Sequence, residues 1–299
     1  MKSWRDLKTD KIEQADVIIA SVSSDRACSV GRGSRYAPQR LRKLSWSLPA
    51  FTAEGISIQA LKLFDAGDIG RQHTSYDKIA IKAKELFAFE KFNLFLGGDH
   101  AVSIPLQAAF FEHCRKINKI PAIIHIDAHP DFCDVYDGSK YSHACTNYRA
   151  IERGYRFEDI VVLGVRGFEE QEIDLFSKHP ELTVIKASTI LKNGLESIID
   201  LKSRFDDRYA IYLSFDIDAI DPSFCPGTGT PETFGLEPGE LTKILNYLIS
   251  NLPIMAMDIV EVSPPLDINN ITSWTALKIL YEIFALLLKK KNQTKANEE

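Results

Sequence analysis

The sequence lacks the features that would associate it with a membrane or with nucleic acid. No run of 18 or more apolar residues predicts a membrane span. The first ten residues alternate in charge and contain no apolar stretch of the kind that a signal peptide requires. The net charge is only -5, and no basic cluster carries interleaved aromatic residues. We therefore expect neither a membrane nor nucleic acid as a partner.

Cysteine is also scarce, because the chain has five, an odd number, and no Cys-x-x-Cys pair. This usage favours a reduced, cytoplasmic setting over a disulfide framework. Cys133, Cys145 and Cys225 lie near the polar segments described below. We interpret them as small buried residues rather than as metal ligands or redox switches, since a site rich in carboxylates favours hard cations over thiolate-binding ones.

Strand-like and helix-like stretches alternate along the 299 residues, which predicts an α/β architecture with a mainly parallel sheet. The expected strands are 15–21, 60–65, 92–96, 122–127, 160–165, 182–186, 210–216 and 254–260. The expected helices are 38–44, 76–89, 104–116, 168–178, 194–205, 238–251 and 273–290. No linker or repeat divides the chain, so we predict one domain over 1–299, with the polar segment 291–299 as a disordered tail.

The last of these helices is apolar on more than one face. Two interpretations stay open for it: packing between the sheet and a partner subunit, or simple burial within the monomer.

Acids and imidazoles gather where three of the expected strands end. Asp127, His129 and Asp131 follow a buried strand at a spacing that places all three on one face of an extended chain. Two ionised carboxylates beside an imidazole would repel each other and be poorly solvated there unless a cation compensated them. This segment therefore predicts a metal site.

Two further strand ends strengthen that prediction. His100 follows a strand and a Gly97-Gly98 turn, and the pair Asp216 and Asp218 ends another strand. In an open parallel sheet, ligands bind outside the carboxyl ends of the strands, so segments that are distant in sequence can meet there. The six candidate ligands offer two imidazoles and four carboxylates, a set that suits Mn²⁺ and can hold two ions if carboxylates bridge them.

Several segments resemble the ureohydrolases, the family of arginases, agmatinases and their relatives. The sequences Gly-Gly-Asp-His at 97–100, Asp-Ala-His-Pro-Asp at 127–131 and Ser-Phe-Asp-Ile-Asp-Ala-Ile-Asp-Pro at 214–222 are similar to the three metal-binding signatures of this family. Segments 64–69, 163–167 and 258–264 also read like family segments. The resemblance implies a three-layer α/β/α sandwich with a mainly parallel sheet, usually assembled as homo-trimers or homo-hexamers.

The same resemblance implies a bridged pair of manganese ions in each chain. Asp127 and Asp216 would bridge the two ions. His100 and Asp131 would complete one ion, and His129 and Asp218 the other. Metal-bound water loses its proton far more readily than bulk water, which would supply hydroxide to attack the carbon of a guanidinium group.

Other polar residues lie beside these segments without matching a family ligand. Strand parity selects His125 as well as Asp127, but the family has no ligand at that position, and we interpret His125 as a buried, hydrogen-bonded core histidine. We assign Asp99, Asp134 and Asp221 to turns or to hydrogen bonds behind the metal site.

Two residues outside the ligand set are candidates for catalysis. Glu261 ends an apolar strand and can accept paired hydrogen bonds from a guanidinium group, as the matching glutamate of the family does. His143 resembles the family histidine that passes protons to the leaving amine, and the ordinary pKa of histidine near 6.5 suits that task. The family usually has glycine after this histidine, whereas this chain has Ala144.

The substrate that the resemblance implies is a small guanidino compound. The loops at 136–143 and 226–232 are more similar to agmatinases than to arginases, whose Ser-Gly-Asn signature is absent, so we expect hydrolysis of agmatine to putrescine and urea. Phe234, where glycine is common in the family, would narrow the pocket. Arginase, guanidino-acid hydrolase and formiminoglutamase activities remain alternatives, as does a catalytically silent binding subunit.

Overall fold

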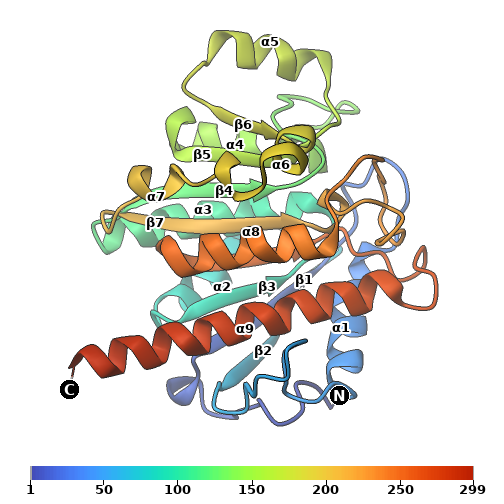
Figure 1. The fold of residues 1–299 in the computed structure, drawn as a ribbon. Helices are drawn as coiled ribbons and strands as arrows, with labels where there is room; N and C mark the ends of the chain where they lie inside the picture. Colours follow the sequence, from blue (N-terminus) through green and yellow to red (C-terminus); the bar gives the residue numbers. More distant parts are fainter. Residues whose placement is uncertain (1, 299) are drawn as a thin grey trace.

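Eight parallel strands form a single sheet at the centre of the molecule (Figure 1). The computed structural model describes residues 2–298. The strand order is β2-β1-β3-β8-β7-β4-β5-β6, and every neighbouring pair is parallel, which confirms the predicted parallel sheet. The strands are β1 (Val17–Ser23), β2 (Leu63–Arg71), β3 (Phe92–Leu96), β4 (Ile120–Ile126), β5 (Ile160–Val165), β6 (Thr183–Lys186), β7 (Tyr209–Asp216) and β8 (Ile254–Val260).

Helices cover both faces of the sheet, so the predicted three-layer sandwich is confirmed. One face packs against α1 (Ala37–Ser45), α6 (Ala187–Asn193), α7 (Leu201–Arg204), α8 (Pro238–Asn251) and α9 (Ile271–Glu298). The other face packs against α2 (Tyr76–Phe87), α3 (Ser103–Lys116), α4 (Thr146–Arg153) and α5 (Glu170–Lys178). Each layer of helices buries its own hydrophobic cluster against the strands.

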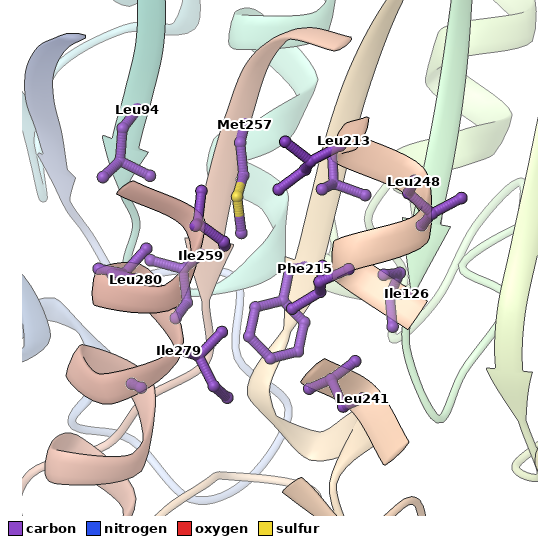
Figure 2. Packing of buried hydrophobic residues seen from close by; sticks show 14 of the residues in the cluster. Leu94, Ile126, Leu213, Phe215, Leu241, Leu248, Met257, Ile259, Ile279 and Leu280 are labelled. Atoms are coloured by element: carbon purple, nitrogen blue, oxygen red, sulfur yellow. The ribbon is translucent and has the colours of Figure 1, made fainter. Parts of the chain in front are cut away.

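The two clusters divide the side chains of each central strand by their alternation. Leu213 and Phe215 of β7 point toward α8 and α9, where they meet Leu248 and Ile279 (Figure 2). Tyr212, the residue before Leu213, belongs to the opposite cluster. Successive side chains of a strand point to opposite faces, so both faces of a buried parallel strand must be apolar. Polar residues inside these strands are therefore exceptions that need a function.

Two of the predicted elements differ from the structure, and one helix was not predicted. The strand expected at 60–65 begins later and continues to Arg71, because Gly67 adopts a positive φ of 75° and the pairing with β1 shifts register twice. The helix expected at 194–205 is broken into a short 3₁₀ turn and α7. Gly194, also at positive φ, instead ends α6, a helix that the sequence did not predict.

The C-terminal helix α9 continues through Glu298, so the tail expected to be disordered from residue 291 is helical up to that residue. Among the described residues, its segment Ile271–Gln293 is the one helix long and apolar enough to cross a membrane. More than half of its most apolar window, 56%, is buried inside the chain, and the helix packs beside α8 and α1. Of the two interpretations left open for this helix, burial within the monomer is the one that the packing supports.

Candidate metal centre and active site

The predicted site residues lie at the carboxyl ends of the four central strands, β3, β8, β7 and β4. His100 opens a 3₁₀ turn after β3, Asp127 follows β4 directly, and Asp216 is the last residue of β7. The turn after β3 depends on Gly98, because a Cβ atom there would lie only 1.8 Å from the carbonyl oxygen of Ser24. Glycine is thus required to bring His100 over the edge of the sheet.

A first group of predicted ligands surrounds the Nδ1 atom of His100. The Oδ2 atoms of Asp127, Asp216 and Asp131 lie 2.9, 3.1 and 3.2 Å from it. One ring nitrogen donates at most one proton, so it cannot satisfy three carboxylates with hydrogen bonds. Convergence of this kind is what a shared cation would explain.

A second group forms around His129, whose Nδ1 atom lies 3.1 Å from Asp218 Oδ2 and 3.5 Å from Asp127 Oδ1. Asp127 therefore belongs to both groups, one oxygen facing each. All six predicted ligands converge. Five of them are buried, whereas the His129 side chain is 28% exposed to solvent.

The electrostatics of the two groups fit a pair of divalent cations. Burial, with the charge of neighbouring carboxylates, raises the pKa of Asp131, Asp216 and Asp218. Burial acts on Asp127 in the same direction, but the adjoining imidazoles outweigh it and hold its pKa well below the usual range. Its buried Oδ2 atom nevertheless accepts no hydrogen bond. Four clustered carboxylates with two imidazoles offer the hard nitrogen and oxygen donors that Mn²⁺ prefers.

His125 differs from its predicted environment. It is fully buried, as expected, but the contacts of its ring nitrogens lack the angles of regular hydrogen bonds. Its ring stacks on His100 at a centroid distance of 4.5 Å, and its Nε2 lies 2.9 Å from Asp127 Oδ2. It can join His100, Asp127 and Asp131 in a group of possible metal-binding atoms that all lie within 4.8 Å of one another.

A buried polar network that we did not predict supports His100 from behind. Its Nε2 atom lies 2.8 Å from Ser214 Oγ, and Ser214 donates to Asp258 Oδ1 at 2.8 Å. Ser103 and Tyr212 also donate to Asp258, at 2.5 and 2.9 Å. Three hydroxyl groups thus satisfy one buried carboxylate, and the network fixes the orientation of the imidazole. Strand alternation, which places Tyr212, Ser214 and Asp216 on one face, was the signal that would have found it.

The two predicted catalytic residues lie next to each other. His143 Nδ1 is 3.6 Å from Glu261 Oε1, and His143 Nε2 is 3.0 Å from Ser29 Oγ. Burial alone would lower the pKa of His143, but the hydrogen bond and charge of Glu261 raise it to about 9. Glu261 itself is buried, and its Oε1 accepts the backbone N–H of His100 at 2.8 Å.

A cavity of about 350 Å³ opens above these residues. The two groups of predicted ligands and His143 line it, whereas Glu261 lies behind His143 and is not among the lining residues. The remaining walls include residues that we did not predict: Ser29, Val30, Tyr136, Phe168, Glu169, Glu172, Thr230, Pro231 and Glu232. Ala144 also lines the cavity. Tyr136 and residues 230–232 belong to the two loops whose similarity to agmatinases pointed to the substrate, whereas the segments of the others carry no metal-ligand pattern that would single them out.

Phe234 does not narrow this cavity. It is absent from the lining residues, and its side chain is 82% exposed. Its φ of 63° explains why glycine suits this position, since a side chain in the left-handed region is strained.

The remaining acids beside the motifs have partners other than the predicted ligands. Asp99 is buried and accepts the backbone N–H of Ala27 at 2.7 Å. Asp134 pairs with Arg149, and Asp221 accepts hydrogen bonds within its own turn. All five cysteines are buried and free.

Comparisons with known proteins agree with this geometry. The model of the Arginase family matches residues 15–285. The agmatinase of Neisseria gonorrhoeae is 34% identical over 287 residues, which cover 93% of this chain and 89% of the relative. The crystal structure of the agmatine ureohydrolase of Thermoplasma volcanium has a TM-score of 0.85 at 28% identity, covering 98% and 96% of the two chains. Proclavaminate amidino hydrolase from Streptomyces clavuligerus has a TM-score of 0.82 at 26% identity, covering 96% and 97%.

Fold and site together define a metal-dependent hydrolase of the ureohydrolase class. The chain belongs to the arginase family, and among its members it is agmatinase-like.

Proposed function

We propose that this chain is a binuclear manganese enzyme that hydrolyses agmatine to putrescine and urea. The observation that carries the choice of substrate is the charge of the cavity wall. Glu169, Glu172 and Glu232 line it above the predicted ligands, and no lysine or arginine is among the lining residues of the described chain. A guanidinium group with a cationic tail suits such a wall, whereas the carboxylates of arginine, guanidino acids and formiminoglutamate would be repelled.

In this proposal His100, Asp131, His129 and Asp218 would hold two manganese ions together with Asp127 and Asp216, which would be shared between them as the resemblance implies. The fit rests on the donor set and on the unpartnered Oδ2 atom of Asp127. When bound, such ions acidify water and so supply a nucleophile at neutral pH.

The chain's own residues position the substrate and move its protons. Glu261, which is buried behind His143, is assigned the N–H groups of the guanidinium, as the resemblance implies, and it keeps lone pairs that the backbone N–H of His100 does not occupy. His143, whose pKa is raised to about 9, holds a proton at neutral pH and passes it to the leaving amine. Ser29 Oγ, 3.0 Å from His143 Nε2, fixes the ring in the cavity wall.

We also infer a homo-trimer or homo-hexamer that works in the cytoplasm. The assembly rests on the family resemblance, and the compartment on the cysteine usage, in which all five thiols are free.

The test is urea release by the manganese-loaded protein from agmatine, arginine, guanidinobutyrate and guanidinopropionate, with formamide release from formiminoglutamate measured alongside. We expect agmatine to give the highest kcat/KM. Preference for an acidic substrate would contradict the argument from wall charge. Two manganese ions retained per chain without turnover of any compound would favour the silent binding subunit.

A further inference from the structure

We propose that Glu232 is the residue that recognises the cationic tail of the substrate, an alkylammonium group, and so selects diamine-like guanidines over neutral and acidic ones. This inference rests on the proposed function, since it assigns the far end of the same cavity. It begins from the three glutamates of the wall, which differ in what their carboxylates already bind.

Two of the three glutamates are committed to the fold. The side chain of Glu172 accepts the backbone N–H groups of Glu169 and Phe132 at 2.9 and 2.8 Å. Glu169 in turn caps α5, because its side chain accepts the backbone N–H of Glu172 in a reciprocal capping box. Neither carboxylate can turn to a ligand without leaving backbone groups at the start of α5 unpaired.

The carboxylate of Glu232 is free by comparison. Within the described chain it accepts no hydrogen bond, and its closest cationic neighbour is His129 Nε2, 3.8 Å from Oε1. Its side chain is 43% exposed, so it can meet a ligand that arrives from solvent. A carboxylate that has no hydrogen-bond donor of its own and is accessible from solvent can bind a second positive charge of the ligand.

The backbone beneath Glu232 is nevertheless held in place. Arg166 donates to the carbonyl oxygens of Glu232 and Thr233 at 2.8 and 3.0 Å, and to that of Asp218 at 2.7 Å. One guanidinium therefore ties the segment of Glu232 to the segment of a predicted metal ligand. These hydrogen bonds hold the backbone of Glu232 at a fixed distance from that of Asp218. A carboxylate held in this way can discriminate between substrates of different length.

The contacts of His129 place Glu232 within reach of a four-carbon tail. His129 stands between the two ends: its Nδ1 faces Asp218 and its Nε2 faces Glu232. The imidazole ring of His129 thus separates Glu232 from Asp218. The two nitrogens joined by four methylene groups in agmatine are roughly 6 Å apart when extended, from ordinary bond lengths. Its guanidinium can reach the predicted metal groups while its ammonium reaches Glu232.

A competing role for Glu232 is orientation of His129, since carboxylates often hold the second nitrogen of a metal-binding imidazole. The 3.8 Å separation exceeds a hydrogen bond, which favours tail recognition. The two roles also predict different results. A residue that orients His129 affects manganese affinity and every substrate equally, whereas a residue that recognises the tail affects only cationic tails.

The experiment compares wild type, Glu232→Gln and Glu232→Lys, with Glu170→Gln as the matched control. Glu170 is an exposed glutamate of α5 that does not line the cavity, so it reports the effect of losing one charge nearby. Each manganese-loaded protein is assayed for urea release from agmatine, butylguanidine and guanidinobutyrate, which share chain length and differ in tail charge. Calorimetric titration with 1,4-diaminobutane and with butylamine measures binding without turnover, and manganese content is determined for every variant.

We expect Glu232→Gln to lower the ratio of kcat/KM for agmatine over butylguanidine about five- to tenfold, mainly through KM, and to weaken 1,4-diaminobutane relative to butylamine by a similar factor. Glu232→Lys should favour guanidinobutyrate. Equal losses on all substrates with reduced manganese content, or an unchanged ratio, would overturn the proposal. If wild type hydrolyses nothing but binds the diamine through Glu232, the tail site stands and the proposed function falls. If the diamine also shows no dependence on Glu232, both fail.

Discussion

Replacing Asp216 by asparagine should stabilise the metal-free protein and weaken the metal-loaded one. Burial, and then the charges of Asp218 and Asp127, raise the pKa of the Asp216 carboxyl well above its ordinary value. A carboxyl whose folded pKa exceeds its unfolded pKa costs stability once the pH rises above the unfolded value near 3.9. Asparagine has the same shape and no charge, and its side-chain oxygen can still accept the N–H of Asp218, which lies 2.8 Å from Oδ1 in the wild type.

The magnitudes follow from what surrounds the carboxylate. One pKa unit corresponds to about 1.4 kcal/mol, so removing the charge of a carboxyl whose pKa burial has raised should be worth roughly 1–4 kcal/mol. In a chain of this size that corresponds to a rise in Tm of roughly 2–8 °C. Manganese acts in the opposite direction: each ion bound at a thousand times its Kd adds about 4 kcal/mol to the stability of the wild type. The variant should lose a large part of that gain, since a neutral amide is a poorer bridge between two cations.

The assay is thermal unfolding at neutral pH, in chelator and in excess manganese, followed by metal analysis after desalting. Asp174→Asn, which removes an exposed carboxylate paired with Lys178, is the control and should change neither Tm by more than about 1 °C. We expect the variant to melt above wild type in chelator and below it in manganese. A variant that melts lower in chelator, or gains as much from manganese as wild type does, would refute both the electrostatic account and the bridging role.

Two further predictions concern the catalytic pair and a distant ion pair. His143→Asn should lower kcat for agmatine by roughly 10²- to 10⁴-fold while two manganese ions stay bound, because His143 supplies a proton rather than a ligand; a parallel loss of manganese would show a structural role instead. Asp65→Asn should cost about 3 kcal/mol in urea unfolding at neutral pH, since Arg42 donates two hydrogen bonds to Asp65 at 2.7 and 2.8 Å. Burial raises the pKa of Asp65, but Arg42 and Trp4 outweigh it and leave the pKa lowered. This stabilisation is therefore present above about pH 4 and lost as the pH falls through the folded pKa, so the difference from wild type should shrink in acid; a constant difference would contradict the assignment.

The sheet and the convergence of the predicted ligands could be foreseen from local patterns. A strand that is buried on both faces is a continuous apolar run, and acids that follow such runs must lie at one edge of a parallel sheet. This reasoning brought His100, Asp127 and Asp216 together from three separate segments. In the structure both carboxylates lie within hydrogen-bonding distance of the Nδ1 atom of His100.

The sequence was less informative where a contact depends on tertiary packing. Parity identified His125, but its stacking on His100 depends on how the turn after β3 meets β4, which no local pattern encodes. The clamp between Arg42 and Asp65 joins α1 to β2 in the same way. The 194–205 segment failed for a local reason, because its helical composition concealed a glycine that ends the preceding helix.

The position of β8 sets when this site can exist during synthesis of the chain. β3 pairs only with β1 and β8, and β7 pairs only with β4 and β8, so the last strand to be synthesised joins two otherwise separate half-sheets. Residues 97–253 lie between β3 and β8, a separation that predicts slow folding. Until β8 inserts, no strand pairing ties β3, which leads to His100, to the strands that carry Asp127 and Asp216. The four predicted carboxylate ligands and His129 lie at or just after the ends of β4 and β7, which pair directly, so β8 completes the ligand set by fixing His100, and metal capture would be strongest once that strand has joined the sheet.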